Sequence, residues 1–172
     1  MQTFASRVII EAEHYLCRMK ILMVCLGNIC RSPLAEGILQ QKATEAGLDW
    51  VIDSAGTGGY HIGEQPHVLS QKVAKLNGIN ISNQRCRQFR KEDMREFDRI
   101  LVMDTDNYNE VKRISKEAWN EKKVSYILDA LYPGEKREIP DPWYGTEKDY
   151  HAVFEMLDKA CEKIIEQYSG NS

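Results

Sequence analysis

Residues 21 to 37, with the sequence ILMVCLGNICRSPLAEG, constrain the fold of this chain more strongly than any other stretch. The stretch begins with a short apolar run, Ile21 to Val24, which suits a strand buried on both faces and is too short for a helix. Ser32 and Pro33 then predict the start of a helix, because a serine hydroxyl can accept a hydrogen bond from a free amide and proline loses no bond in the first turn. A buried strand followed by a tight loop and a helix predicts a parallel sheet.

The loop between this strand and this helix carries a Cys-x5-Arg motif, from Cys25 to Arg31. Gly27 and Asn28 tolerate the positive φ angles of a tight loop, in which successive amides point inward and form a cradle for a tetrahedral oxyanion. These amides, the helix N-terminus and Arg31 favour an ionised sulfur at Cys25, and the planar guanidinium can hold two phosphate oxygens. We therefore predict that Cys25 is a nucleophile and that the phosphate is bound by Leu26, Gly27, Asn28, Ile29, Cys30 and Arg31.

An isolated Cys-x5-Arg is more often a small core cysteine and an unrelated surface arginine, but the flanking strand and the Gly-Asn and Ser-Pro pairs argue against that alternative. Residues 24–33, VCLGNICRSP, resemble the signature loop of the low-molecular-weight protein tyrosine phosphatase family. The resemblance continues, in unchanged order, through VIDS at 51–54, GI at 78–79, KED at 91–93 and DPWYG at 141–145. It implies a phosphatase domain over residues 19–168 that hydrolyses protein phosphotyrosine and small aryl phosphates through a phosphocysteine intermediate.

Length and composition indicate one globular domain. The 172 residues carry a formal charge of −3, which gives no general attraction to nucleic acid or an anionic membrane, so any attraction of phosphate has to be local to one site. An odd number of cysteines at irregular spacing does not suggest secreted disulfides and favours a cytoplasmic location. Neither an export signal nor a membrane-spanning run is visible, and no Cys/His spacing indicates a metal site. The cysteines are Cys17, Cys25, Cys30, Cys86 and Cys161.

Predicted strands and helices alternate along the rest of the chain. Strands are expected at residues 21–24, 50–53, 99–103 and 124–128, and helices at 33–46, 68–76, 105–114, where Thr105 is the expected cap, and from Asp149 onward. This alternation predicts a single-domain α/β fold with a four-stranded parallel sheet in the flavodoxin-like or Rossmann-like order 2-1-3-4, right-handed crossovers and helices on both faces. Residues 1–18 match no clear element beyond a short helical turn at 8–16 and are interpreted as an N-terminal extension, and residues 169–172 as a C-terminal tail.

A thiolate that attacks a phosphate ester needs an acid to protonate the leaving oxygen, and no residue in the loop can supply this proton. Asp141 is the best candidate, since it lies between Pro140 and Pro142 in an irregular stretch that should border the carboxyl ends of the strands. On the residues alone, Pro-Asp-Pro can also be a rigid turn. The resemblance implies that Asp141 is the general acid and then the base, and that it acts with Cys25 and Arg31 without a metal or cofactor.

Substrate choice is predicted to depend on aromatic residues at the rim of the pocket. Tyr60, Trp143 and Tyr144 fall in the two loops expected to flank the site, and aromatic walls suit a planar aryl phosphate, although such residues can also simply pack loops. By resemblance, Tyr60 takes a position that is often aromatic, and Trp143 replaces a frequent tyrosine. Family members that act on phosphoarginine tend to have threonine where this chain has Ile29, so Ile29 favours phosphotyrosine.

Three polar residues are expected to brace the loop. Asn28, Ser32 and Ser54 match bracing residues of the family that the chain resembles, and Ser32 can also donate a hydrogen bond to the Cys25 sulfur. Capping and turn roles are the alternative for such residues. Asn77 departs from the family, because some relatives have histidine there, and this change is expected to alter the bracing network in detail.

Cys30 is a candidate redox partner of Cys25 in a reversible disulfide, or else a small buried residue. The nearest rival function is a thiol-coupled arsenate reductase of the same fold, but that chemistry needs a further redox cysteine pair, and only Cys86 lies in a comparable region. A phosphate-binding or redox-sensing module without turnover is a second alternative, which the presence of Cys25, Arg31 and Asp141 together disfavours. The expected partners are a phosphotyrosine-containing protein as substrate and a tyrosine kinase, with the chain acting as a monomer.

Overall fold

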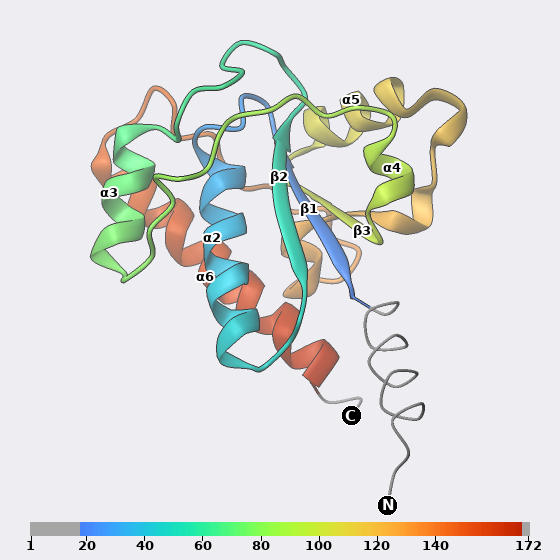
Figure 1. Ribbon diagram of the computed structural model, residues 1–172. Coiled ribbons are helices and arrows are strands. Elements are labelled where there is room, and N and C mark those ends of the chain that lie inside the picture. Colours follow the sequence, from blue (N-terminus) through green and yellow to red (C-terminus); the bar gives the residue numbers. More distant parts are fainter. Residues whose placement is uncertain (1–17, 170–172) are drawn as a thin grey trace, which may run out of the picture.

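The computed structural model describes residues 18–169 and contains a four-stranded parallel sheet with the strand order β2-β1-β3-β4. This order confirms the predicted 2-1-3-4 arrangement (Figure 1). Cys25 lies beside Gly56 where β1 and β2 both reach their carboxyl ends. The helical turn predicted at 8–16 and nearly all of the two predicted terminal segments lie outside the described residues. The strands are β1 (Lys20–Cys25), β2 (Val51–Gly56), β3 (Arg99–Val102) and β4 (Val124–Tyr126).

Helices cover both faces of this sheet, as the alternation of elements predicts. Figure 1 shows α2 (Arg31–Glu45), α3 (Val68–Leu76) and α6 (Glu147–Ser169) on one side, and α4 (Asp93–Glu96) and α5 (Thr105–Ser115) on the other. The chain between α5 and α6 also forms the 3-10 helices η1 (Lys116–Ala118), η2 (Glu121–Lys123) and η3 (Ile127–Ala130). The sheet is therefore the middle layer of three.

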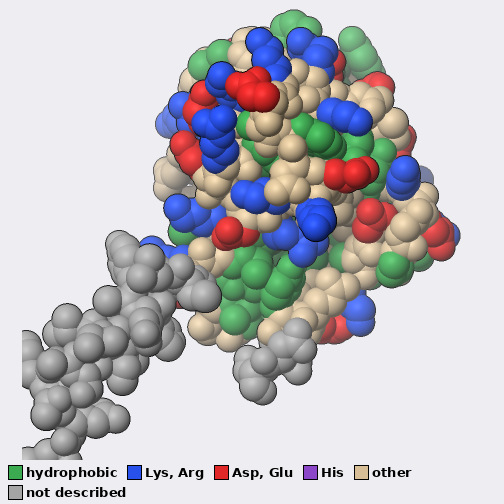
Figure 2. Space-filling view, turned by 90° about the vertical axis from the view of Figure 1, so that its right-hand side faces the viewer, with side chains coloured by type: hydrophobic (Ala, Val, Ile, Leu, Met, Phe, Trp, Pro, Cys, Tyr) green, Lys and Arg blue, Asp and Glu red, His purple; other side chains and the backbone are tan. Residues whose placement is uncertain are grey.

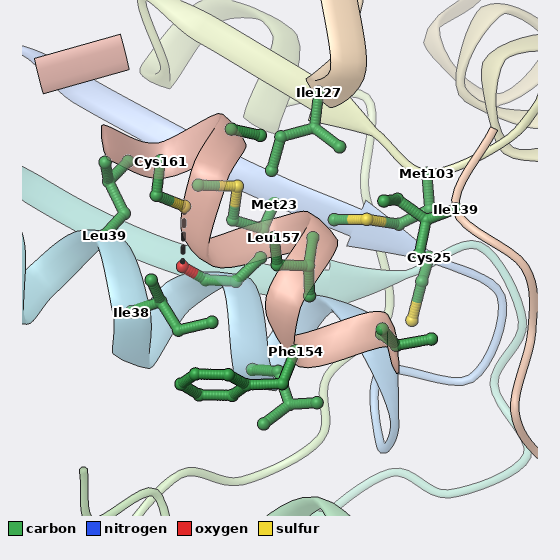
Figure 3. Close-up of a cluster of buried hydrophobic side chains, with 14 of the residues drawn as sticks. Met23, Cys25, Ile38, Leu39, Met103, Ile127, Ile139, Phe154, Leu157 and Cys161 are labelled. Carbon is green, nitrogen blue, oxygen red and sulfur yellow. Dashed lines mark hydrogen bonds between the residues drawn. The ribbon is translucent and has the colours of Figure 1, made fainter. Parts of the chain in front are cut away.

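The alternation of side chains along β1 divides the core into two clusters. Met23 and Cys25 belong to the cluster that α2 and α6 cover, whereas Val24 belongs to the cluster that α4 and α5 cover. Figure 3 shows Cys25 at the margin of the first cluster, which also holds Met103 and Ile139. The predicted nucleophile thus sits at the end of a strand whose position is maintained by burial on both faces.

All four strands differ in length from the sequence prediction, and the differences in β2 and β4 are of two or more residues at the carboxyl end. β2 continues through Gly56, so Ser54 lies within the strand, whereas the predicted strand ends at residue 53. The glycines that follow Ala55 are typical of a loop. Ser54 and Gly56 are nevertheless buried and pair in register with β1. β4 ends at Tyr126, where the chain turns into η3 and not into the two further strand residues that the apolar run predicts.

α2 and α6 each begin two residues earlier than predicted, and α5 begins at the predicted residue but has a different cap. α6 starts at Glu147, because the Asp149 carboxylate accepts a hydrogen bond from the Thr146 amide at 2.6 Å and closes the first turn two residues earlier than expected. The cap of α5 is Asp104 and not Thr105: an oxygen of Asp104 accepts the amide hydrogen three residues further on, at 2.8 Å. In both cases a short carboxylate accepts a free amide hydrogen of the first turn.

Charged side chains of both signs are interspersed over the face shown in Figure 2, and hydrophobic side chains gather in its lower part. Over residues 18–169, no helix is long and apolar enough to span a bilayer. The same part of the chain holds no group of three His, Cys, Asp or Glu side chains arranged to bind a metal ion. With a net charge of −3, the chain can attract an anion only through local groups.

Candidate active site

The loop from Cys25 to Arg31 joins the carboxyl end of β1 to the first turn of α2. Asn28 has a φ angle of 54°, the left-handed conformation for which the sequence supplies an asparagine. The predicted capping of the helix by Ser32 is wrong, since α2 begins at Arg31 and has no side-chain cap. The amides of the first turn are therefore available to an anion, and the Ser32 hydroxyl is used elsewhere in the site.

The carbonyl groups of this loop are tied to the surrounding chain. Because the carbonyl and the following N–H of a trans peptide point in opposite directions, each outward carbonyl turns the next amide inward. The resulting ring of donors is of the kind that binds a tetrahedral oxyanion, and its amides are those of Leu26, Gly27, Asn28, Cys30 and Arg31. The outward bonds run from Thr57 N to Cys25 O (2.9 Å), Gly58 N to Leu26 O (2.8 Å), Cys86 Sγ to Gly27 O (3.1 Å), His67 N to Ile29 O (2.7 Å) and Ser70 Oγ to Cys30 O (3.1 Å).

The Cys25 sulfur lies inside this ring. The residue is only 2% exposed, and its sulfur accepts a hydrogen bond from the Asn28 amide at 3.3 Å and lies 3.1 Å from the Ser32 hydroxyl oxygen. The side-chain amide of Asn28 donates to the hydroxyls of Ser32 at 2.9 Å and Ser54 at 2.8 Å. The three residues predicted to brace the loop are thus joined in one buried network that reaches the sulfur.

Close packing of the loop on β2 depends on Gly56. A Cβ atom at this position would lie 2.8 Å from the Leu26 carbonyl oxygen and 3.0 Å from the Asn28 amide nitrogen. Both contacts are with backbone, which cannot move aside as a flexible side chain can. The end of β2 therefore approaches the loop at a distance that only glycine permits.

The Arg31 guanidinium is buried, and acceptors within residues 18–169 hold it at Nη1 but not at Nε. Its Nη1 donates to the Asp104 carboxylate at 2.6 Å and to the Ile139 carbonyl at 3.0 Å, and its Nη2 lies 3.2 Å from the Asp141 carboxylate. Burial lowers the pKa of Arg31, but the Cys25 sulfur and the two carboxylates outweigh burial and raise this pKa above its usual value. Nε is buried and has no hydrogen-bond partner among the residues described. The edge formed by Nε and Nη2 is therefore oriented to hold two oxygens of a phosphate.

Asp104 is a site residue that sequence reasoning missed. It follows β3 after one intervening residue, and its position at the carboxyl end of a central strand was the available signal, because ligands of parallel α/β folds bind there. One of its carboxylate oxygens holds Arg31 and the other caps α5. Asp104 thus fixes the arginine relative to the sheet.

Asp141 comes from the irregular segment before α6, and its side chain is 40% exposed. One carboxylate oxygen accepts a hydrogen bond from the Trp143 amide at 3.1 Å, and the other faces Nη2 of Arg31. The Ile139 amide donates to the Met103 carbonyl at 2.8 Å and so attaches this segment to the end of β3. The predicted acid therefore lies beside the open edge of Arg31.

A cavity of about 490 Å³ opens over the loop and is lined by the predicted rim residues together with His61. Tyr144 is 97% exposed and Trp143 41%, so both rings stand at the mouth of the cavity. The His61 ring lies 5.5 Å from the Trp143 ring, and its Nδ1 is 2.9 Å from a Glu64 carboxylate oxygen. Sequence reasoning missed His61, because a single histidine in a glycine-rich loop forms no motif. The lining comprises Cys25, Leu26, Gly27, Ile29, Cys30, Arg31, Tyr60, His61, Asp141, Trp143 and Tyr144.

The side chains of Cys30 and Asn77 make contacts outside the phosphate-binding loop and its bracing network. The Cys30 thiol lies 3.4 Å from the Tyr150 hydroxyl of α6, and burial raises the pKa of this thiol to about 12. Asn77 donates from its side chain to the Val73 carbonyl at 2.9 Å and so closes the end of α3. Its contact is therefore with the helix and not with the network around Asn28.

Attack by a cysteine sulfur on a phosphate held by amides and an arginine is the chemistry that this geometry serves, so the fold and the site define a cysteine-based phosphatase. A family model described as low molecular weight phosphotyrosine protein phosphatase matches residues 20–171. The chain belongs to this family.

Individual relatives agree over most of the chain. The low molecular weight phosphotyrosine protein phosphatase of Gallus gallus is 40% identical over 149 residues, which are 86% of this chain and 94% of that protein. The crystal structure of a protein tyrosine phosphatase from Entamoeba histolytica, with Hepes in its active site, matches with a TM-score of 0.79 and 37% identity over 89% of this chain and 98% of that one. YfkJ from Bacillus subtilis matches with a TM-score of 0.81 and 32% identity over 90% and 97%. The family predicted from residues 24–33 is thereby confirmed.

Proposed function

We propose that this chain hydrolyses phosphotyrosine in proteins, and small aryl phosphates, through a phosphocysteine intermediate on Cys25. The observation that carries the proposal is the open Nε edge of Arg31 beside a ring of inward amides that contains the Cys25 sulfur. Such a site offers a phosphate both a buried positive charge and directed donors. Membership of the phosphatase family supports the same reaction.

In the first step, the Cys25 thiolate attacks phosphorus in line with the bond to the tyrosine oxygen. The sulfur–phosphorus bond forms as the phosphorus–oxygen bond breaks, while Arg31 and the amides hold the equatorial oxygens. Protonated Asp141 gives its proton to the departing oxygen, which leaves as a neutral phenol. The Asp141 carboxylate accepts a hydrogen bond from Nη2 of Arg31 at 3.2 Å, and a bound phosphate that takes this N–H releases Asp141 for proton transfer.

In the second step, water attacks the phosphocysteine. The Asp141 carboxylate left by the first step takes a proton from this water, the new phosphorus–oxygen bond forms, and the phosphorus–sulfur bond breaks. Inorganic phosphate and the Cys25 thiolate result, and Asp141 is again protonated. These steps use only the side chains of Cys25, Arg31 and Asp141 with the loop amides.

The rim supports phosphotyrosine as the substrate. Tyr60, Trp143 and Tyr144 surround the mouth of the cavity, so an aryl ring between the phosphate and the peptide has aromatic walls to contact. A phosphoserine phosphate is attached by a shorter side chain and reaches the Arg31 edge less readily. Ile29 lines the cavity with an apolar side chain and offers no hydroxyl to a guanidino group.

Neither rival function is favoured. Cys86 is the only cysteine in a region comparable to that of the redox cysteines of an arsenate reductase. Its thiol donates a hydrogen bond to the Gly27 carbonyl at 3.1 Å, and burial raises the pKa of this thiol to about 11. A thiol in this state supports the loop and reacts slowly. Family membership argues against an arsenate reductase, and the presence of the acid Asp141 argues against a binding module without turnover.

We also propose a protein substrate, a partner kinase, a cellular location and an oligomeric state for the chain. The substrate is a phosphotyrosine-containing protein and the functional partner is the tyrosine kinase that phosphorylates it, with the enzyme acting as a cytoplasmic monomer. The four described cysteines are free thiols, which suits a reducing compartment. Sedimentation velocity of the purified full chain tests the oligomeric state, and a concentration-independent dimer would contradict it.

The mechanism is tested with aryl phosphates whose leaving groups differ in basicity. We expect Cys25→Ser to abolish turnover and Asp141→Ala to slow it roughly 10² to 10⁴-fold, most strongly for basic leaving groups that need the proton. Equal losses across all leaving groups would remove Asp141 from its role as acid. Turnover by Cys25→Ser would overturn the phosphocysteine mechanism.

A further inference from the structure

Glu36 is a half-buried carboxylate in α2 to which the mechanism above gives no role. Its Oε2 accepts a hydrogen bond from the Ser54 hydroxyl at 2.5 Å. Ser54 is 4% exposed and belongs to the network that braces the loop. The Glu36 carboxylate therefore contacts one end of this network, and the Cys25 sulfur lies at the other end.

The direction of the hydrogen bonds at Asn28 follows from its two kinds of side-chain atom. The carbonyl oxygen Oδ1 accepts the Arg87 amide hydrogen at 2.9 Å, which fixes which way the side chain is turned. The NH2 group then faces the two hydroxyls and donates one hydrogen to Ser32 and the other to Ser54. Both serine oxygens are thus acceptors toward Asn28.

Each hydroxyl has only one hydrogen, so its second bond must be a donation. Ser54 donates to Glu36, and Ser32, whose oxygen lies 3.1 Å from the sulfur, donates to Cys25. Asn28 is the common donor, so the two hydroxyl hydrogens both point away from it. If the Ser54 hydrogen had no acceptor, the Ser54 hydroxyl could turn this hydrogen toward the Asn28 amide group and weaken the bond that holds the side chain. Because the same side chain also holds Ser32, Glu36 can act on the sulfur through the position of Asn28.

We propose that Glu36 is a positioning residue for the nucleophile, and that its carboxylate, by accepting the Ser54 hydrogen, keeps the Ser54 oxygen facing Asn28, which in turn holds the Ser32 hydroxyl that donates to the Cys25 sulfur. This inference rests on the proposed function of Cys25. A protonated Glu36 carboxyl can itself donate to Ser54, whose hydrogen is then free to turn toward the Asn28 amide group, so only the ionised form keeps the Ser54 oxygen facing Asn28. Protonation of Glu36 is thereby coupled to the donors at the sulfur.

The surroundings of Glu36 bring this protonation close to neutral pH. Burial raises the pKa of Glu36 to about 7; the Ser54 hydrogen bond and Arg87 act against this rise, and Asp53 adds to it. Asp53 of β2 is itself paired with Arg87, which also pairs with Asp93 of α4. On the helices packed against α2, Lys72 of α3 pairs with Glu147 of α6, and Asp158 of α6 pairs with Lys42 of α2.

The test measures the rate at which iodoacetamide alkylates Cys25 as a function of pH, with the modified peptide identified by mass spectrometry. Alkylation reports the sulfur and its donors without requiring turnover. We expect the parent to show an inflection near pH 7, from Glu36, in addition to that of the sulfur. Glu36→Gln, which has nearly the same shape, should lose the inflection near pH 7. Glu45→Gln removes an exposed carboxylate from the same helix and should behave as the parent.

A second variant separates positioning from simple packing. Glu36→Ala leaves the Ser54 hydrogen without an acceptor, so we expect the alkylation midpoint of Cys25 to move to higher pH and kcat for an aryl phosphate to fall roughly five- to tenfold, with KM little changed. Circular dichroism and thermal melting confirm that each variant is folded.

Two results would overturn the inference: retention of the inflection near pH 7 by Glu36→Gln, or a parent-like alkylation profile and kcat in folded Glu36→Ala. The proposed function fails separately, if the parent hydrolyses no aryl phosphate or Cys25→Ser does. The alkylation profiles are readable in either case, so the two failures are distinguishable.

Discussion

Nη1 of Arg31 lies 2.6 Å from Oδ2 of Asp104, and this ion pair joins the phosphate-binding loop to the carboxyl end of β3. The arginine side chain is only 2% exposed and the aspartate side chain 19% exposed, so water screens the pair weakly. Because Asp104 and the Ile139 carbonyl occupy Nη1, the guanidinium cannot rotate to present a different edge. The open Nε edge is thus set by a residue that does not itself contact the phosphate.

Replacing Asp104 with asparagine is expected to weaken phosphate binding and to destabilise the fold. Removal of one partner leaves the buried charge of Arg31 less compensated, and we expect a loss on the order of 2 to 4 kcal/mol in the free energy of unfolding, moderated by the remaining Ile139 and Asp141 contacts. The inhibition constant of inorganic phosphate should rise roughly tenfold as the guanidinium loses its anchor. Urea unfolding and inhibition assays measure both effects. Asp106→Asn, an exposed change in the first turn of α5, is the matched control, and equal effects of the two changes would remove Asp104 from this role.

Gly56→Ala is expected to damage the loop without removing any functional group. The added methyl would lie 2.8 Å from the Leu26 carbonyl oxygen, so either β2 or the loop has to shift. We expect kcat/KM for an aryl phosphate to fall roughly 10²-fold, since misplacement of a site by about 1 Å has this cost. Gly27→Ala, whose methyl would meet the His61 side chain at 3.4 Å, is expected to be milder. The steric argument fails if Gly56→Ala is as active as the parent.

The fold and the chemistry of the loop are predictable from sequence because both are local. The apolar run before Cys25, the left-handed asparagine at position 28 and the arginine that opens α2 lie within one short stretch, and the proposed acid Asp141 lies between two prolines. The strand, loop and helix are specified by residues close together in the sequence, whereas the assignment of Asp141 as the acid comes from the family resemblance. The sheet order then follows from the alternation of elements.

The residues that sequence reasoning missed act across long sequence separations. Asp104 contacts Arg31 from 73 residues away, and Ser54 links Asn28 to Glu36 across separations of 26 and 18 residues. The residues that neighbour Glu36 in the sequence give no indication that its carboxylate contacts Ser54. The capping errors at Ser32 and Thr105 are local instead, since the Ser32 hydroxyl contacts Cys25 and Asn28 of its own loop and Asp104 directly precedes the predicted cap.

Glu36→Gln is expected to stabilise the protein at alkaline pH and to leave it unchanged at acidic pH. The pKa of Glu36 is raised from 4.5 to about 7 in the fold, so the native state holds its proton more tightly than the unfolded state does. By linkage, the free energy of unfolding of the parent then falls as pH rises from about 4.5 to about 7 and stays lower above that range. Glutamine does not titrate, so the variant should gain on the order of 1 to 3 kcal/mol at pH 8 and almost nothing at pH 4. Urea unfolding of both proteins at these two pH values measures the gain, and a pH-independent difference would contradict the assignment.

Cys30 is predicted to protect Cys25 during oxidation. Peroxide converts the Cys25 thiolate to a sulfenic acid, and the Cys30 thiol can displace its hydroxyl to give a disulfide and water. Because burial raises the pKa of Cys30 to about 12, this thiol stays protonated and the closure should be slow. We expect Cys30→Ser to regain less activity than the parent after peroxide followed by a thiol reductant, and Cys161→Ser, which changes a buried cysteine in α6, to recover as the parent does. Full recovery of Cys30→Ser would exclude the redox role.

Trp143→Ala is expected to separate recognition of the aryl group from recognition of the phosphate. The Trp143 ring lies 5.5 Å from the rings of both His61 and His67, so its loss opens one wall of the cavity but leaves the loop and Arg31 in place. We expect KM for a phosphotyrosine peptide to rise roughly three- to tenfold, the effect of losing one aromatic contact, whereas the inhibition constant of inorganic phosphate stays within about twofold. A parallel rise of both constants would mean that Trp143 acts through the loop, and unchanged KM would mean that the ring only packs the segment that carries Asp141. Trp119→Ala, which removes a tryptophan in the opposite core cluster, controls for a general loss of stability.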